Sequence, residues 1–389
     1  MNNKKQAIYL IGALRSPIGK LHGALAHWRP DDLAAAVLKE LLQQATVDPS
    51  LIDGIVLGCA NQAGEDNRNI ARMVALLAGL DYSSTALTVN SLCSSSLEAT
   101  LMGLRQIALG EGDCYVVGGV ESMSRSPWVI SKIDQSKVDS MIGWRFVNPK
   151  LAPMSLSMAQ TAELLAEAYN ISRTAQDKYA QQSRLRYQAA LEQNIWAQEI
   201  APLTISSASY CKDEQHRVLS SALLAKMPPI VKGGQYITAG NAARVGDGAA
   251  LLLLASERFV QQQQLRPLAK ITHWASAACH PNQMSYAAVA ASKKLLHQAQ
   301  LSAQSLDWVE YSESFALQVL LGIKELGLSP EIVNPHGGAL SIGNPIAAGA
   351  IRTVVSLANQ MQRSSDLRYG LATTAGGLGT GAAVLLEQA

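Results

Sequence analysis

The sequence has little charge of either sign. Only 16% of its 389 residues are Asp, Glu, Lys or Arg, and the formal net charge is +2, whereas an average soluble protein has about 25% charged residues. Disordered chains combine low hydrophobicity with high net charge, so the 48% hydrophobic content excludes disorder. A dedicated nucleic-acid binder would carry a basic surplus. The composition predicts a compact protein of two or three domains, with uncharged surface that includes an oligomer interface.

Disulfide, metal and membrane patterns are also missing. The five cysteines have no C-x-x-C spacing, which excludes a disulfide framework and the common zinc motifs; they are Cys59, Cys93, Cys114, Cys211 and Cys279. Most of them are expected to be small buried hydrophobic residues. No apolar run of about 18 residues is free of charge, Gly or Pro, so no membrane span is predicted. We expect a cytoplasmic protein with no metal and no contact with nucleic acid or membrane.

Short apolar runs alternate with longer segments of helical period. Buried strands are predicted at 7–14, 54–58, 86–89 and 114–117, and helices at 31–46, 94–109 and 174–193. The run at 7–14 lacks the cleavage site of a signal peptide, which favours a strand there. Alternating strands and helices are typical of parallel sheets that helices cover on both faces.

The chain repeats itself. Residues 33–56 align without a gap on residues 287–310, and both copies run helix, loop, Asp, strand, with Asp53 and Asp307 in matching places. A shorter match links 246–251 to 379–384. Two Ala-rich helices match by composition alone, but the shared Asp and the following strand favour an internal duplication.

The repeat divides the chain into three expected parts. Residues 1–120 with 230–268 form one half, and residues 269–389 form the other. The more polar segment 121–229 belongs to neither copy. We expect this segment to be an inserted loop domain that carries substrate contacts.

Three turns lie where a predicted strand gives way to a helix or another strand, the position at which α/β sheets bind ligands. In the turn within 88–99, Cys93 falls at a helix start, where free amides and the macrodipole favour a thiolate. From position alone, Cys93 is either a nucleophile or a buried structural cysteine. The turn at 334–349 is rich in glycine. The turn at 373–381 suits backbone amides that bind an oxyanion, or is a tight turn before the last strand.

At these turns the sequence resembles the thiolase family, also called acetyl-CoA acetyltransferases or β-ketothiolases, over essentially the whole chain. The motifs are R-S-P-I-G-K at 15–20, the Cys93 turn, G-G-V-E-S-M-S at 118–124 and A-G-N-A-A with G-D-G-A-A at 239–250. The resemblance implies a duplicated, layered α/β/α/β/α fold with an inserted loop domain that contacts coenzyme A. It also implies a homodimer or homotetramer, and no cofactor beyond the CoA thioester substrate.

The resemblance assigns roles to the turns. Cys93 corresponds to the nucleophile that attacks an acyl-CoA, and Gly377 belongs to the oxyanion turn. The family's Gly-His-Pro motif reads G-N-P here, with Asn344 in place of the base. The second cysteine, which abstracts the α-proton for Claisen condensation, is Ala375, and the oxyanion-hole Asn is Ser312. Both acid–base groups are therefore replaced.

Five further residues complete the predicted site. Glu313 follows a family Glu that supports the site, and is also a candidate base. His336 either reaches the cavity or is a loop residue with a satisfied hydrogen bond. The resemblance implies that Met158, Ala243 and Phe315 contact substrate, although many relatives have Ser in place of Ala243 near the CoA arm.

A cysteine keeps some reactivity without a base, because a few per cent is thiolate at neutral pH and a helix start increases that share. Ala375 cannot remove a proton from carbon. We therefore expect an acyltransferase that forms an acyl-thioester on Cys93 from an acyl-CoA or acyl-carrier thioester. It would pass the acyl group to an acceptor without ordinary reversible thiolysis, with Asn344 and Ser312 as hydrogen-bonding groups.

Two alternatives remain. Initiating ketoacyl-ACP synthases, in the same superfamily, carry Asn at the Gly-Asn-Pro turn and lack the second cysteine, which favours a decarboxylative Claisen-condensing enzyme. They pair that Asn with a His, however, where this chain has Ser312. The other alternative is a catalytically degenerate subunit that scaffolds an active partner in a hetero-complex.

Overall fold

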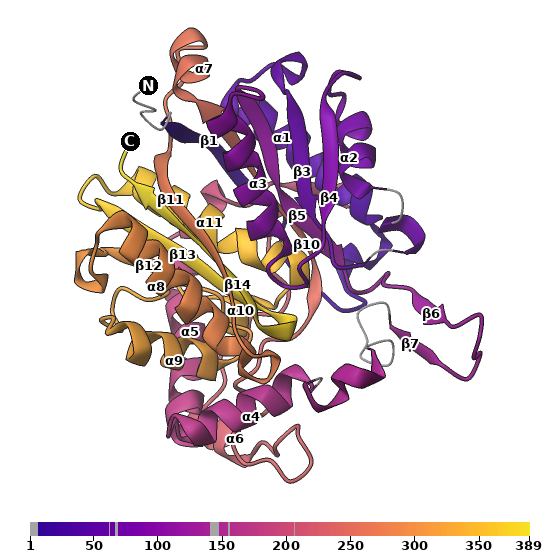
Figure 1. Ribbon diagram of the computed structural model, residues 1–389, viewed down its shortest axis with the longest axis vertical. Helices are drawn as coiled ribbons and strands as arrows, with labels where there is room; N and C mark the ends of the chain where they lie inside the picture. The colour runs from indigo at the N-terminus through magenta and orange to yellow at the C-terminus, as the bar shows by residue number, and fades with distance from the viewer. Residues whose placement is uncertain (1–6, 62, 67–68, 141–147, 155, 206) are drawn as a thin grey trace.

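The computed structural model describes the chain except for residues 1–6, 62, 67–68, 141–147, 155 and 206 (Figure 1). Its central feature is a ten-stranded sheet with the strand order β12-β13-β14-β11-β1-β10-β5-β3-β4, in which β2 also pairs with β10. The strands are β1 (Ile8–Arg15), β2 (Gly19–Lys20), β3 (Gly54–Gly58), β4 (Thr85–Val89), β5 (Cys114–Ser122), β10 (Gly246–Ser256), β11 (Ala269–Ala278), β12 (Trp308–Tyr311), β13 (Tyr369–Gly376) and β14 (Thr380–Glu387).

The sheet consists of two similar halves. In the first half, β10 is antiparallel to both β1 and β5, and β5 is parallel to β3. In the second half, β14 is antiparallel to both β11 and β13, and β13 is parallel to β12. An antiparallel pairing of β1 with β11 joins the halves. The predicted duplication is confirmed.

The repeated aspartates show how closely the two halves correspond. Asp53 Oδ2 accepts hydrogen bonds from the two amides where β5 begins, at 2.7 and 2.9 Å. Asp307 Oδ2 does the same for the two amides where β13 begins, at 2.8 and 2.9 Å. The matched aspartates therefore have the same role: Asp53, just before β3, binds the start of β5, and Asp307, just before β12, binds the start of β13.

Helices form three layers around the two halves of the sheet. Helices α1 (Pro30–Ala45) and α2 (Ile70–Ala78) pack on the outer face of the first half, and α8 (Ala287–Ala299) and α9 (Ala316–Leu326) on that of the second. Helices α3 (Ser95–Leu109) and α11 (Ile346–Arg363) lie between the halves and share one apolar cluster with strands of both. The layered α/β/α/β/α fold follows from this arrangement.

The expectation of parallel sheets was wrong for most strand pairs. Among the strands of the described residues, only the β3–β4, β3–β5 and β12–β13 pairs are parallel. Strands β13 and β14 are joined by the short turn Gly377–Gly379, and a turn of this length connects only antiparallel neighbours. Because β10 occupies the matching place in the first half, it too runs antiparallel to its neighbours.

The segment between β5 and β10 lies outside the large sheet. It contains the hairpin β6 (Trp128–Ile130) and β7 (Val138–Ser140), which projects from the molecule, and helices α4 (Met158–Ala168), α5 (Arg173–Glu192) and α6 (Ser221–Lys226) (Figure 1). A second small hairpin consists of β8 (Leu203–Ile205) and β9 (Ala208–Tyr210), and two short helices elsewhere are α7 (Glu257–Gln262) and α10 (Ala339–Ile342). Among the described residues, no helix has the length and apolar character needed to cross a membrane.

Candidate active site

Cys93 lies in the turn between β4 and α3. The side chains of this turn bind its backbone: Asn90 Oδ1 accepts from the Leu92 amide at 3.0 Å, and Ser95 Oγ accepts from the Ser91 amide at 2.8 Å. Such local bonds let a short polar sequence replace helix hydrogen bonds at the helix start. They hold Cys93, which is 6% exposed, directly before α3.

The oxyanion turn between β13 and β14 packs against the Cys93 turn. A Cβ atom on Gly377 would lie 2.6 Å from Leu92 Cδ1, and one on Gly376 would lie 2.8 Å from Ser94 Oγ. The lack of side chains at both glycines favours this close approach. The backbone amide of Gly377 lies near enough to the Cys93 sulfur to lower the pKa of the thiol. The structure thus brings together a thiol and an amide that are 284 positions apart in the sequence.

The Gly-Asn-Pro turn at 343–345 is the third turn that contributes to the candidate site. The Asn344 amide donates to the Arg244 carbonyl at 2.7 Å, and the next residues, Ile346 and Ala347, pack against Cys93. The Asn344 side chain is 8% exposed, and its Oδ1 atom faces Gly349 without a hydrogen-bond partner among the described residues. A carboxamide can donate a hydrogen bond through its nitrogen but cannot accept a proton from a thiol.

The loop after β12 contributes Ser312 and Glu313. The Ser312 amide donates to the Thr373 carbonyl at 3.0 Å, which holds Ser312 beside β13. The Glu313 carboxylate is fully buried and accepts four hydrogen bonds, from Tyr179 Oη (2.7 Å), Ser183 Oγ (2.9 Å), Asn334 Nδ2 (2.9 Å) and the Leu340 amide (3.0 Å). With both oxygens occupied, Glu313 anchors the loop to α5 rather than taking a proton from substrate.

The inserted segment reaches the site through α4. Met158, the first residue of α4, packs against the cluster that contains Cys93. On the other side, the Ala243 amide donates to the Ser314 carbonyl at 3.0 Å, and Ala242 pairs with Phe315. The predicted substrate contacts Met158, Ala243 and Phe315 therefore come from segments that border the same region.

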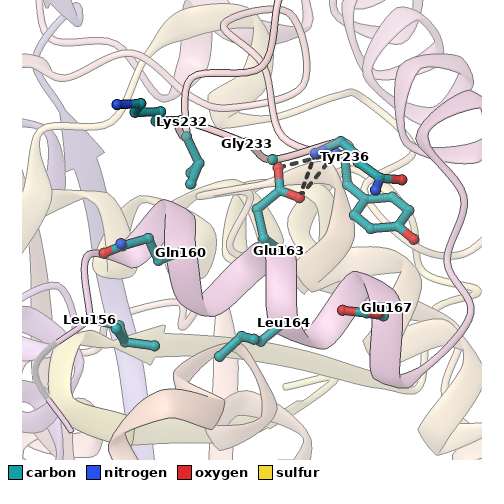
Figure 2. Close-up of a pocket in the computed structure, with 11 residues that line it drawn as sticks. Leu156, Gln160, Glu163, Leu164, Glu167, Lys232, Gly233 and Tyr236 are labelled. Atoms are coloured by element: carbon teal, nitrogen blue, oxygen red, sulfur yellow. Dashed lines mark hydrogen bonds between the residues drawn. The ribbon is translucent and has the colours of Figure 1, made fainter. Parts of the chain in front are cut away.

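Glu163 on α4 hydrogen-bonds the backbone of the loop that contains Tyr236 (Figure 2). Its carboxylate accepts from the amides of Gln235, Tyr236 and Ile237 at 2.9, 3.0 and 2.7 Å. Glu163 lines a cavity of about 350 Å³ between α4 and the loop at 231–236. This link ties the loop to the helix whose first residue packs near Cys93.

The pKa of the Cys93 thiol is raised to about 11. Burial is the main cause and the nearby charge of Glu121 adds to it, while the amides of Gly377 and of Cys93 itself act in the opposite direction. The amide at the helix start therefore acts in the expected direction, but burial outweighs it. At pH 7 a thiol with this pKa is ionised in about one molecule in ten thousand.

Sequence reasoning missed Glu121 as part of the site. Its buried carboxylate accepts from the amides of Ala60, Asn61 and Ala347 at 3.0, 3.1 and 3.3 Å, and burial raises its pKa. It therefore fastens the start of α11 to β5 beneath Cys93. A glutamate inside the otherwise uncharged motif at 118–124 was the available signal.

His336 does not reach the cavity. Its ring packs against Trp196 and Trp308, with centroid distances of 6.1 and 5.0 Å. Burial and the charge of Arg363, at the far end of α11, lower its pKa to about 4. Because α11 begins beside Cys93 and rises 1.5 Å per residue, Arg363 is about 25 Å from the site. The suggestion that His336 could act there was wrong.

The other cysteines pack less uniformly than expected. Cys59 and Cys114 are buried, Cys279 is half-buried and Cys211 is exposed. Most of the five cysteines are therefore buried, as expected, and Cys211 is the exposed exception. Among the described residues, no three His, Cys, Asp or Glu side chains cluster in a way that could hold a metal ion.

Comparison with protein families matches nearly the whole chain. Residues 8–258 match the thiolase N-terminal domain, and residues 265–388 match the thiolase C-terminal domain. The β-ketoadipyl-CoA thiolase of Acinetobacter baylyi is 41% identical over 98% of this chain and 99% of its own length. The 3-oxoadipyl-CoA/3-oxo-5,6-dehydrosuberyl-CoA thiolase of Escherichia coli is 40% identical with the same coverage.

Solved structures agree with these matches. Human mitochondrial 3-ketoacyl-CoA thiolase in complex with CoA superposes with a TM-score of 0.93 at 31% identity, covering 99% of this chain and 98% of that one. The acetyl-CoA acetyltransferase of Bacillus anthracis superposes with a TM-score of 0.93 at 33% identity, covering all of both chains.

Proposed function

Because the chain belongs to the thiolase family of acyltransferases, we propose that it accepts an acyl group from an acyl-CoA thioester on Cys93. The observation that carries this proposal is the Cys93 sulfur beside the backbone amide of Gly377. In the proposed step the Cys93 sulfur attacks the thioester carbonyl and its proton leaves with the CoA sulfur. In this proposal the amides of Gly377 and Cys93 stabilise the oxyanion while it exists.

We propose that the acceptor molecule supplies the nucleophile that attacks the acyl group on Cys93. Ala375, fully buried on β13, offers only a methyl group where a proton on carbon would have to be removed. An oxygen, nitrogen or carrier-thiol nucleophile, or a pre-activated carbon, avoids that step. We therefore propose transfer to such an acceptor rather than ordinary reversible thiolysis, with Asn344 and Ser312 donating hydrogen bonds.

The names of the relatives suggest which acyl groups to test. A β-ketoadipyl-CoA thiolase splits its substrate with CoA into succinyl-CoA and acetyl-CoA, so both are proposed donors here. An acyl-carrier thioester remains a further candidate donor. No cofactor other than the thioester is proposed.

The test is the mass of the Cys93 peptide after the protein is mixed with acetyl-, succinyl- or medium-chain acyl-CoA. A mass increase that matches the acyl group, and is absent from Cys93→Ala, is the expected result. Measurements at pH 7 and pH 9 allow for the high pKa of the thiol. If the wild-type protein gains no more mass than Cys93→Ala with any donor at either pH, the proposal fails.

That high pKa favours one second candidate, a subunit that scaffolds an active partner. A thiol that is almost fully protonated at neutral pH is a weak nucleophile. Co-purification with a catalytic homologue, together with an unchanged complex in Cys93→Ala, would support this candidate. The decarboxylative alternative would instead release CO₂ from malonyl-CoA.

We also propose a cytoplasmic homodimer or homotetramer built from two thiolase-like halves and a loop domain. The edge strand β4 supports an interface between copies, because its Leu87 side chain is 44% exposed and an open strand edge favours pairing. Light scattering coupled to size-exclusion chromatography measures the oligomeric state, and a monomer at all concentrations would contradict this part of the proposal.

A further inference from the structure

Strained backbone is concentrated around Cys93. Twelve residues other than glycine have positive φ in the part of the chain that the structure describes, and three of them carry hydrocarbon side chains. These three are Leu92 (+51°), Ile346 (+36°) and Leu378 (+60°). Leu92 precedes Cys93, Leu378 follows Gly377, and Ile346 belongs to the same buried cluster as Cys93. A β-branched residue at positive φ is a genuine outlier, which makes Ile346 the most unusual of the three.

The neighbours of Ile346 force its backbone into this conformation. Before it, the Asn344 amide is bound to the Arg244 carbonyl at 2.7 Å. After it, the Ala347 amide is bound to Glu121 Oε2 at 3.3 Å. Strained dihedrals persist where surrounding contacts determine them in this way. Glycine would satisfy the same backbone without strain, so the presence of isoleucine has to be explained by its side chain.

That side chain is part of the small buried cluster that contains Cys93. Ile346 is 8% exposed and shares a buried cluster with Cys93 and Ala60, against which Met123 and Met158 pack. Methionine side chains are flexible and adapt to different shapes. Isoleucine is branched at Cβ and has few rotamers. The cluster therefore combines one rigid wall with two deformable ones.

We propose that Ile346 is a specificity-determining residue that excludes acyl groups branched at the α-carbon. This inference rests on the proposed acyl transfer to Cys93. In the acyl-enzyme the carbonyl carbon is bonded to the sulfur, so the α-carbon is the next atom to meet the wall that Ile346 forms. A longer linear chain displaces the methionines, whereas an α-methyl branch meets a side chain that cannot move.

The experiment compares acyl loading of Cys93 from acetyl-CoA and isobutyryl-CoA. Wild type should prefer acetyl, and Ile346→Ala and Ile346→Gly should raise the isobutyryl-to-acetyl rate ratio by about tenfold or more, as one methylene does in an apolar pocket. Ile346→Val, the mildest change, should give an intermediate ratio. Ile351→Ala removes an equal side chain from the same helix, but from the cluster between the sheet halves, and should leave the ratio unchanged.

The backbone strain has a separate readout. In an ordinary helix Gly is less stable than Ala, but at positive φ the order is reversed. Ile346→Gly should therefore melt at or above the temperature of Ile346→Ala. A lower value for the Gly variant would contradict the strained conformation.

The possible outcomes distinguish failure of acyl transfer to Cys93 from failure of the role proposed for Ile346. If wild type loads no acyl group, the proposed function fails. If wild type is acylated but the ratio is the same in all Ile346 variants, the function stands and the role of Ile346 is refuted. If Ile351→Ala shifts the ratio as much as Ile346→Ala, the selectivity is a general packing effect and the role of Ile346 is again refuted.

Discussion

The reactivity of Cys93 should rise tenfold for each pH unit from pH 7 to about pH 10. The perturbation is the pH itself, and the probe is iodoacetamide, which reacts with the thiolate. With the pKa of Cys93 at about 11, the ionised fraction grows from about 10⁻⁴ at pH 7 to about 10⁻² at pH 9. An unperturbed cysteine, with a pKa of about 8.5, is already about 3% ionised at pH 7. Cys93 should therefore react about 300-fold more slowly than such a thiol.

The assay follows alkylation of individual peptides by mass spectrometry. Exposed Cys211 provides an internal control for reagent and folding in the same sample. Burial and the charge of Glu121 are the physical causes of the expected slow reaction. A Cys93 rate that levels off below about pH 9 would refute the reasoning, because it would show that the amides at the helix start outweigh burial.

Three further predictions concern the turns near Cys93 and His336. The double variant Asn344→His with Ala375→Cys should gain acetoacetyl-CoA cleavage with CoA, since one general acid–base group raises a reaction rate by about 10²- to 10⁴-fold. If an ultraviolet assay of the thioester shows no gain, the substrate pocket must differ as well. Gly377→Ala places a Cβ 2.6 Å from Cδ1 of Leu92, the mobile end of that side chain, so Leu92 should move aside and acyl loading should fall by less than about tenfold. A loss of about 10²- to 10³-fold, the cost of removing one oxyanion donor, would show instead that the amide is displaced. His336 has a pKa of about 4 in the folded protein, below its unfolded value, so its stabilising effect is present above pH 6.5 and is lost as the pH falls towards 4. In chemical denaturation, the free energy of unfolding of His336→Phe should fall less steeply with decreasing pH than that of the wild type. Equal pH dependence in both proteins would contradict the lowered pKa of His336.

Local patterns in the sequence predicted the elements well. The strand at 54–58 is β3 itself, and the helix expected at 174–193 is α5, one residue earlier at each end. Apolar runs and helical periodicity arise from burial of one face, so a short window contains the information. The match of Asp53 with Asp307 also lies within a short window of sequence, and it predicted the duplication.

Features that depend on distant contacts could not be predicted. The helix start suggested a reactive Cys93, but burial and the charge of Glu121 raise its pKa, and both depend on the folded arrangement. His336 is close to Asn344 in sequence, yet its ring packs against Trp196 and Trp308. Sequence distance does not reveal the direction of a side chain.

The duplicated architecture divides the candidate site between the two halves of the sheet. Helices α3 and α11 hold matching places, each preceding the parallel-paired strand of its own half, and the site lies where the starts of both helices meet. Cys93 comes from the first half, and Glu121 lies on β5, a strand of the same half of the sheet. Ser312, Asn344 and Ala375 all come from the second half. A chimera that joins the first 268 residues to the C-terminal half of a relative would therefore exchange these three positions in a single crossover between β10 and β11.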